Sequence, residues 1–260
     1  MSKVPQVTVA FWVIKICATT VGETGGDALS MTLNLGYAVS TLIFLAYFAV
    51  ALTAQLMAKR FHAFFYWALV VATTTVGTTT SDYMDRTLGL GYIKSSIAMF
   101  LAVLAVLFIW RRVTGAIAVD HITDRKNEVF YWLTILVSNT LGTALGDFTA
   151  DDAGLGFEGG ALVFFGLIAL VGAAYRFTKI PRAILFWAAY VLTRPLGATL
   201  GDMLTKPLSH GGLNLGRFES SLAIAAVMVV GVVVTSRWPW GGRVEPEAAP
   251  TPVAAPTDNQ

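Results

Sequence analysis

Long apolar stretches alternate with short polar ones along the chain. A membrane-crossing helix needs about 20 mostly apolar residues. Eight segments approach this length: 7–30, 37–57, 64–80, 92–110, 129–146, 159–175, 183–201 and 220–236. The odd-numbered segments contain Thr, Gly and acidic residues, whereas the even-numbered ones are almost purely apolar. The pattern predicts an all-α polytopic membrane protein with eight transmembrane helices.

The odd-numbered segments are copies of one another. Each begins with a tryptophan: Trp12, Trp67, Trp132 and Trp187. Ten residues later comes a glycine: Gly22, Gly77, Gly142 and Gly197. Five residues further comes an aspartate: Asp27, Asp82, Asp147 and Asp202. Because the register repeats without a gap, it indicates internal duplication.

Each repeat is expected to be a helical hairpin of one polar and one apolar helix. The repeats cover residues of about 7–60, 61–115, 127–180 and 181–238. Since each contains two crossings, all have the same orientation, which predicts parallel pseudo-symmetric repeats about an axis along the membrane normal. We expect a single transmembrane domain over 1–238 and a disordered cytoplasmic tail over 239–260, where Pro and Ala are frequent.

This arrangement resembles a bacterial membrane family catalogued as domain of unknown function 347. Members of that family carry four tandem repeats, each with two membrane helices and a shared tryptophan. The four repeated tryptophans occupy that position, and the resemblance covers residues 11–237. It implies a fold but no activity, so function has to be argued from the site.

Composition and charge agree with a lipid-embedded chain. Hydrophobic residues make up 55% of the chain, charged residues 13%, and the mean hydropathy is +0.66. A soluble domain carries about 25% charged residues. Twelve basic residues fall in one set of loops and four in the opposite set, which predicts a multi-pass protein of the bacterial inner membrane with both termini cytoplasmic. There is no basic stripe for nucleic acid, and the single Cys17 excludes a disulfide framework.

Small residues recur four apart in each polar segment. The pairs are Gly22 and Gly26, Gly77 and Ser81, Gly142 and Gly146, and Gly197 and Gly201. Such spacing lets membrane helices approach closely. We therefore expect the four polar helices to cluster inside and the four apolar helices to face lipid. The repeated tryptophans are expected to anchor the helices at the headgroup level, with substrate contact as the alternative.

Acidic residues carry the functional argument, because ionisable groups within a membrane are costly. Each repeated aspartate lies about 22 Å along its helix from the tryptophan, near the opposite interface. These aspartates either cap the turn that follows or form a ring of inward carboxylates that share protons or bind a cation. Glu23 occurs in the first copy only and lies on the same helix face as Asp27.

Two basic residues lie inside polar segments. Arg194 precedes Pro195 and could pair with Glu23 or with an aspartate across helices, while Lys15 is too far from Glu23 for direct contact within one helix. Supporting oxygen or amide groups are present at Thr19, Thr20, Thr74, Thr75, Asn139 and Thr140. They would supply ligands or helix–helix hydrogen bonds.

These residues favour a transporter or channel for a small inorganic cation. Oxygen ligands suit hard ions such as Mn²⁺, Mg²⁺ or Ca²⁺, so we expect Glu23 and the four aspartates to bind a divalent metal such as manganese as cargo, with no cofactor. A non-transporting scaffold or regulatory protein is the alternative. An enzyme is not expected, since no nucleophile–base motif occurs. The sequence does not determine the substrate, the coupling or the oligomeric state.

Overall fold

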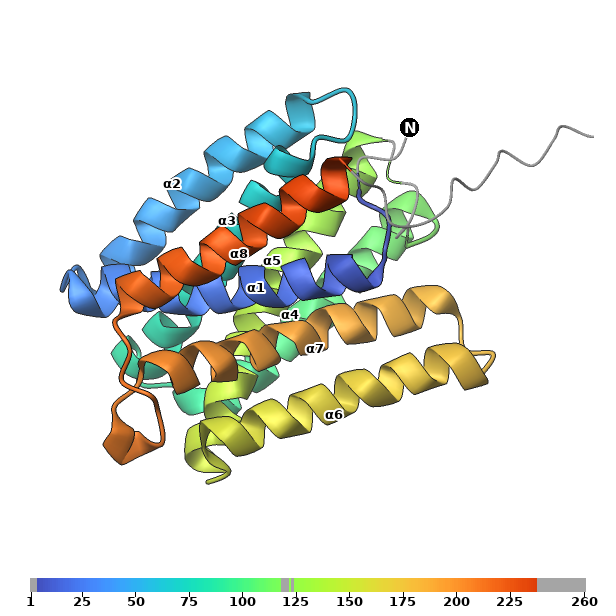
Figure 1. Cartoon of the computed structure of the whole chain (residues 1–260). Coiled ribbons are helices and arrows are strands. Elements are labelled where there is room, and N and C mark those ends of the chain that lie inside the picture. The colour runs from blue at the N-terminus through green and yellow to red at the C-terminus, as the bar shows by residue number, and fades with distance from the viewer. Residues whose placement is uncertain (1–3, 118–121, 123, 238–260) are drawn as a thin grey trace, which may run out of the picture.

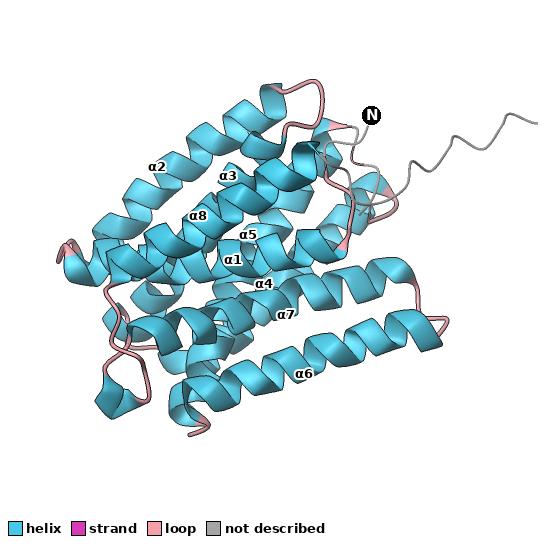
Figure 2. Ribbon diagram, viewed as in Figure 1, coloured by secondary structure: helices cyan, strands magenta, loops and turns pink. Residues whose placement is uncertain are grey.

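The computed structural model describes residues 4–117, 122 and 124–237, and within these residues all regular structure is helical. The predicted tail at 239–260 lies outside them. Four polar helices carry the repeated tryptophans: α1 (Val9–Asp27), α3 (Ala63–Asp82), α5 (Arg125–Asp147) and α7 (Arg182–Thr205). Four apolar helices follow them in turn: α2 (Gly36–Met57), α4 (Gly91–Thr114), α6 (Gly156–Phe177) and α8 (Arg217–Arg237). Figure 2 shows these helices joined by short loops at the two ends of one bundle.

The polar helices form a closed inner ring. Helix α1 contacts α3, α3 contacts α5, α5 contacts α7, and α7 returns to contact α1. In the most apolar stretch of each helix, 67% of the residues of α5 and 56% of those of α7 are buried. The corresponding share in the apolar helices is 11% to 17%. The polar helices thus lie inside and the apolar ones outside, as the sequence predicts.

The apolar helices wrap around this ring in a way that the repeats alone do not reveal. Helix α2 packs on α3, α4 on α5 and α6 on α7, while α8 closes the circle by packing on α1 (Figure 1). Each apolar helix therefore lies mainly against the polar helix of the next repeat. The two helices of one repeat are joined by a turn but make few contacts with each other, so the hairpin predicted for each repeat is not held together by its own two helices.

Within the part of the chain that the structure describes, six helices are long and apolar enough to cross a membrane: α2, α4, α5, α6, α7 and α8. Helices α1 and α3 are not among them. The first carries Lys15, Glu23 and Asp27, and the second is rich in threonine. Because both lie in the inner ring, surrounding helices cover their polar groups. Length and composition thus support six of the eight predicted crossings, and the crossings of α1 and α3 stay a prediction.

Glycines set how closely neighbouring ring helices approach. A side chain at these positions would collide with the next ring helix: Gly22 with Thr74, Gly77 with Asn139, Gly142 with Arg194, and Gly197 with Thr19. One turn further, Gly26 faces Thr78, Gly146 faces Ala198 and Gly201 faces Glu23. The same register positions meet at each junction, where the absence of a side chain lets the two helices lie close together.

The two ends of the bundle differ. We name the turn end the one at which each polar helix leads into the apolar helix of its own repeat. It carries short π-helical segments after α1, α3 and α5: η1 (Ala28–Thr32), η2 (Tyr83–Thr87) and η3 (Phe148–Asp152). The fourth repeat has a longer loop there with a 3-10 turn, η4 (Leu208–His210). Gly36, Gly91 and Gly156 follow the π-helical turns with φ of 74°, 73° and 66°, a conformation that glycine adopts without steric cost. The opposite end, where residues 4 and 237 lie, we name the terminal end.

Candidate functional site

The four repeated aspartates lie at the turn end of the inner ring. All are buried, between 1% and 3% exposed. The capping hypothesis is wrong for Asp27, Asp82 and Asp147, because none of these side chains bonds to the amides of the turn it precedes. Asp202 instead contacts a basic residue one turn later. Their carboxylates therefore face basic partners and one another rather than backbone.

Lys206 bridges two of these aspartates. Its ammonium lies 3.0 Å from Asp27 Oδ2 and 3.1 Å from Asp202 Oδ1. Burial alone would lower the pKa of Lys206, but the Asp202 and Asp27 carboxylates outweigh it and hold the pKa well above its ordinary value. Arg217 approaches Asp27 from the rim, with its Nε at 3.6 Å. Lys206 is thus a charged bridge between the fourth repeat and the first.

Arg86 bridges the other two aspartates. Its Nε donates to Asp82 Oδ1 at 3.1 Å, and its Nη2 lies 3.9 Å from Asp147 Oδ2. Arg86 and Lys206 each stand four residues after the aspartate of their own repeat, in the second and fourth copies only. By sequence alone both fall among the four basic residues of the opposite set of loops. Their shared position in the register was the signal that could have identified them as partners.

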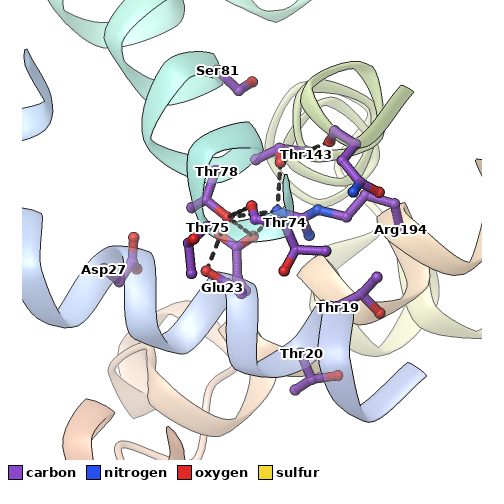
Figure 3. A network of polar contacts seen from close by, with 12 residues as sticks. Thr19, Thr20, Glu23, Asp27, Thr74, Thr75, Thr78, Ser81, Thr143 and Arg194 are labelled. Carbon is purple, nitrogen blue, oxygen red and sulfur yellow. Dashed lines mark hydrogen bonds and ion pairs between the residues drawn. The ribbon is translucent and has the colours of Figure 1, made fainter. Parts of the chain in front are cut away.

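A second charged layer lies one turn deeper. Arg194 Nη2 lies 2.8 Å from Glu23 Oε2 and 2.6 Å from the hydroxyl oxygens of Thr78 and Thr143 (Figure 3). Thr78 Oγ1 also lies 3.3 Å from Glu23 Oε2. Glu23, Thr78 and Thr143 occupy the same register position in three repeats. Of the two pairings considered for Arg194, the structure contains the one with Glu23.

The ring has room for the long side chain of Arg194 because the other three repeats carry short side chains at the equivalent position. Its register equivalents are Thr19, Thr74 and Asn139. A single long cation among three short polar side chains reaches across the ring to three neighbouring helices. The guanidinium is fully buried, so the ion pair with Glu23 is a condition for placing that charge inside.

Three carboxylates come close enough to share one ion. Oxygen atoms of Glu23, Asp147 and Asp202 all lie within 4.8 Å of one another, and all three residues are buried. Asp27 and Asp82 lie outside this group, although Lys206 and Arg86 link them to it. We name Glu23, Asp147 and Asp202 the three-carboxylate cluster. Carboxylate oxygens at such separations are the donors that hard divalent cations take.

The predicted supporting residues divide into two groups. Thr19 and Thr74 bond across helices, with hydroxyls 3.2 Å from the carbonyl oxygens of Thr193 and Ala18, and Asn139 donates to Thr73 at 3.0 Å. The hydroxyls of Thr20, Thr75 and Thr140 bond to carbonyls of their own helices. Ser81 donates to Asp85 at 3.2 Å. None of these groups is shown to contact the three-carboxylate cluster.

Lys15 does not join the cluster. It is fully buried nearer the terminal end, with its ammonium nitrogen 4.3 Å from the centre of the Tyr190 ring. Among the described residues its Nζ has no hydrogen-bond partner. The absence of a Lys15–Glu23 contact agrees with their separation of two helical turns.

Aromatic rings close the terminal end of the inner ring. Ring centroids lie 5.5 Å apart for Phe11 and Trp67, 5.3 Å for Tyr66 and Trp132, 5.7 Å for Tyr131 and Trp187, and 5.8 Å for Phe186 and Trp12. In each pair, the residue before one tryptophan meets the tryptophan of the next repeat. The interface-anchor prediction is wrong for Trp67 and Trp132, which are 5% and 1% exposed. The aromatic residue that precedes every tryptophan was the overlooked signal.

The fold and the site together define a class. A helical bundle with an apolar exterior and a paired set of charges inside is the architecture of an integral membrane protein. A family model described as Repeat of Unknown Function (DUF347) matches the chain four times, at residues 10–61, 65–116, 130–180 and 185–238. The chain belongs to this repeat family. No curated protein and no solved structure matches it.

Proposed function

We propose that all eight helices cross the bacterial inner membrane, as parallel repeats with both termini in the cytoplasm. Helices α1 and α3 have 19 and 20 residues. At 1.5 Å per residue they reach about 30 Å, the thickness of the hydrocarbon core. The basic loops lie at the terminal end, which supports a cytoplasmic position for that end. The aspartates would then face the outer side.

We further propose that the protein transports a cation through this acidic site, with a divalent metal such as manganese as cargo. The supporting observation is the charge balance of the inner ring. Five buried carboxylates, those of Glu23 and the four repeated aspartates, are contacted by four cations, Arg86, Arg194, Lys206 and Arg217. The site therefore keeps an excess of negative charge, which favours binding of a cation.

The three-carboxylate cluster is the expected place for that ion. Mn²⁺ and Mg²⁺ are hard cations that bind carboxylate oxygens and keep several waters. The cluster offers three carboxylates, and water would complete the coordination. The side chains of Arg86 and Lys206 are 36% and 15% exposed, which supports access from the turn end. The aromatic closure at the terminal end would have to open for passage.

A scaffold without transport is the second candidate. The observation in its favour is that every carboxylate of the site already contacts a basic side chain. In that case the charges would only hold the helices together. The two functions differ in whether Mn²⁺ binds and moves.

Metal flux into proteoliposomes separates these candidates. Asp147→Asn removes one cluster ligand, while Arg86 keeps its closer partner Asp82. Asp152→Asn, at an exposed residue of η3, is the matched control. We expect the first variant to lose at least about tenfold in Mn²⁺ flux at an unchanged melting temperature, and the second to keep it. Absence of Mn²⁺ flux in the wild-type protein, or equal flux in the two variants, would contradict the proposal and favour the scaffold.

A further inference from the structure

Each member of the three-carboxylate cluster already faces a cation that belongs to the chain. Glu23 faces Arg194 at 2.8 Å, Asp202 faces Lys206 at 3.1 Å, and Asp147 faces Arg86 at 3.9 Å. An incoming ion therefore meets occupied ligands. What it must displace depends on how firmly each of these cations is held.

Arg194 is held firmly. It is fully buried, and its Nη2 contacts Glu23, Thr78 and Thr143 from three different helices. A Cβ at Gly142 would collide with its side chain, so the neighbouring helix also encloses it. Arg194 has no other acidic partner among the ion pairs of the described residues. It therefore stays with Glu23 whatever else binds.

Arg86 and Lys206 are held differently, because each has an acidic partner outside the cluster. Arg86 lies closer to Asp82, at 3.1 Å, than to Asp147, at 3.9 Å. Lys206 lies 3.0 Å from Asp27, in addition to its contact with Asp202. Both residues sit at the turn end and are partly exposed. Each can shift onto the aspartate outside the cluster, Asp82 for Arg86 and Asp27 for Lys206, and still have a carboxylate as its partner.

Such a shift leaves two carboxylates free at neighbouring positions. Asp82 then keeps Arg86, Asp27 keeps Lys206, and Glu23 keeps Arg194. Asp147 and Asp202 remain, with two negative charges between them. A second observation points to the same rearrangement: Lys206 donates a hydrogen bond to Asp27 Oδ2 at 3.0 Å, whereas Asp202 Oδ1 has no hydrogen-bond partner among the described residues. Arg217 also contacts Asp27, at the rim of the bundle, and would adjust its position when Lys206 shifts.

We propose that Arg86 and Lys206 are tethered competitor cations that make the site selective for divalent over monovalent ions. This rests on the proposed function. A tethered group competes at an effective concentration of the order of millimolar or more. A monovalent ion gains no more Coulomb energy from a carboxylate than the cation it replaces, whereas a divalent ion gains about twice as much. Only a divalent ion would also neutralise both freed aspartates.

Binding of Mn²⁺ to the purified protein tests this proposal. Arg86→Gln and Lys206→Gln each remove one competitor, and Lys94→Gln is a control at an exposed residue near the same end. We expect each of the first two variants to bind Mn²⁺ about tenfold more tightly and to become sensitive to 150 mM Na⁺, a concentration chosen near the physiological ionic strength of ~0.15 M. Lys206→Arg, which keeps the charge, should restore insensitivity to Na⁺. Unchanged or weaker Mn²⁺ affinity in folded variants would overturn the proposal.

Labelling of the wild-type protein gives a second test that needs no substitution. If Mn²⁺ shifts Lys206 away from Asp202, its amine should react several-fold faster with an acylating reagent when Mn²⁺ is bound. Lys94 should react at the same rate with and without the metal. Bound Mn²⁺ with unchanged Lys206 labelling overturns the competitor role alone. Absence of Mn²⁺ binding in the wild type and in every variant overturns the proposed function as well.

Discussion

Arg194 of α7 and Glu23 of α1 form an ion pair at 2.8 Å in the middle of the inner ring, with side-chain exposures of 0% and 3%. The two residues are 171 positions apart in the chain. Removing one partner of a buried pair leaves an uncompensated charge, which costs about 3–5 kcal/mol. This pair should therefore dominate the stability of the first-to-fourth repeat junction.

We expect Arg194→Thr and Glu23→Thr each to lower the melting temperature sharply in detergent. The double variant should recover most of the loss, because it places in both positions the residue that other repeats carry there, Thr74 and Thr78. A thermal unfolding series of the four proteins measures the coupling. Equal and additive losses would show that the two charges do not depend on each other.

Gly197 should tolerate no side chain. A Cβ there would meet both the side chain and the backbone of Thr19, and overpacking of this kind costs about 1–3 kcal/mol. Gly166 on α6 has open space around its Cβ position. Gly166→Ala should be neutral or slightly stabilising, since glycine in a helix costs about 0.5–1 kcal/mol relative to alanine. Melting temperatures of the two alanine variants check this, and a loss at both sites would contradict it.

Trp132 should contribute to the free energy of unfolding as much as a residue of a hydrophobic core does. It is 1% exposed and packs on Tyr66 and Tyr131. Trp132→Ala should cost about 3–5 kcal/mol, as large-to-small changes in a core do. Phe177→Ala, at a residue that is 81% exposed, should change stability by less than about 0.5 kcal/mol. Chemical unfolding in mixed micelles compares them. Similar effects at both positions would restore the interface-anchor interpretation of the tryptophans.

Asp124 should make the start of α5 sensitive to pH. Its Oδ1 accepts from the Asn127 amide at 2.9 Å, and this backbone bond, with the Asn127 side chain, lowers the pKa of Asp124. The stabilisation is present above the pKa of the unfolded state and is lost as the pH falls through the lower pKa of the folded state. Protection of the amides of residues 125–131 against hydrogen exchange, relative to the intrinsic rate at each pH, should fall over that range.

Asp124→Asn supplies the control for this pH dependence. Asparagine caps helices about as well as aspartate but does not titrate near pH 4. Protection of the α5 amides in this variant should therefore stay constant where the wild-type protection falls. A variant that loses protection in parallel with the wild type would assign the effect to another group.

The secondary structure and the sidedness of the helices follow from local pattern. Eight apolar stretches, a tryptophan register and pairs of small residues four apart predict which segments are helical and which face lies inside. These properties depend on residues within a few turns of each other, because helix geometry relates their side chains directly. Gly22 and Gly142 show this: their packing role is visible from spacing alone.

The composition of the site could be predicted only in part. The sequence singles out Glu23, Arg194 and the four aspartates, since charges inside a membrane segment stand out. It does not single out Arg86 or Lys206, which look like ordinary loop residues until their distance from the preceding aspartate is compared between repeats. It also left open whether the aspartates cap turns or face partners.

The repeat, the helices and the number of charged residues inside them can all be derived from the sequence. Which of these charges meet depends on how the helices pack. Lys206 reaches Asp27 across 179 residues because α7 returns to contact α1, and each apolar helix packs on the next repeat rather than its own. Such contacts depend on how closely the glycine-containing surfaces of the four polar helices pack. That packing involves all four helices at once, so it cannot be read from the sequence of any one of them.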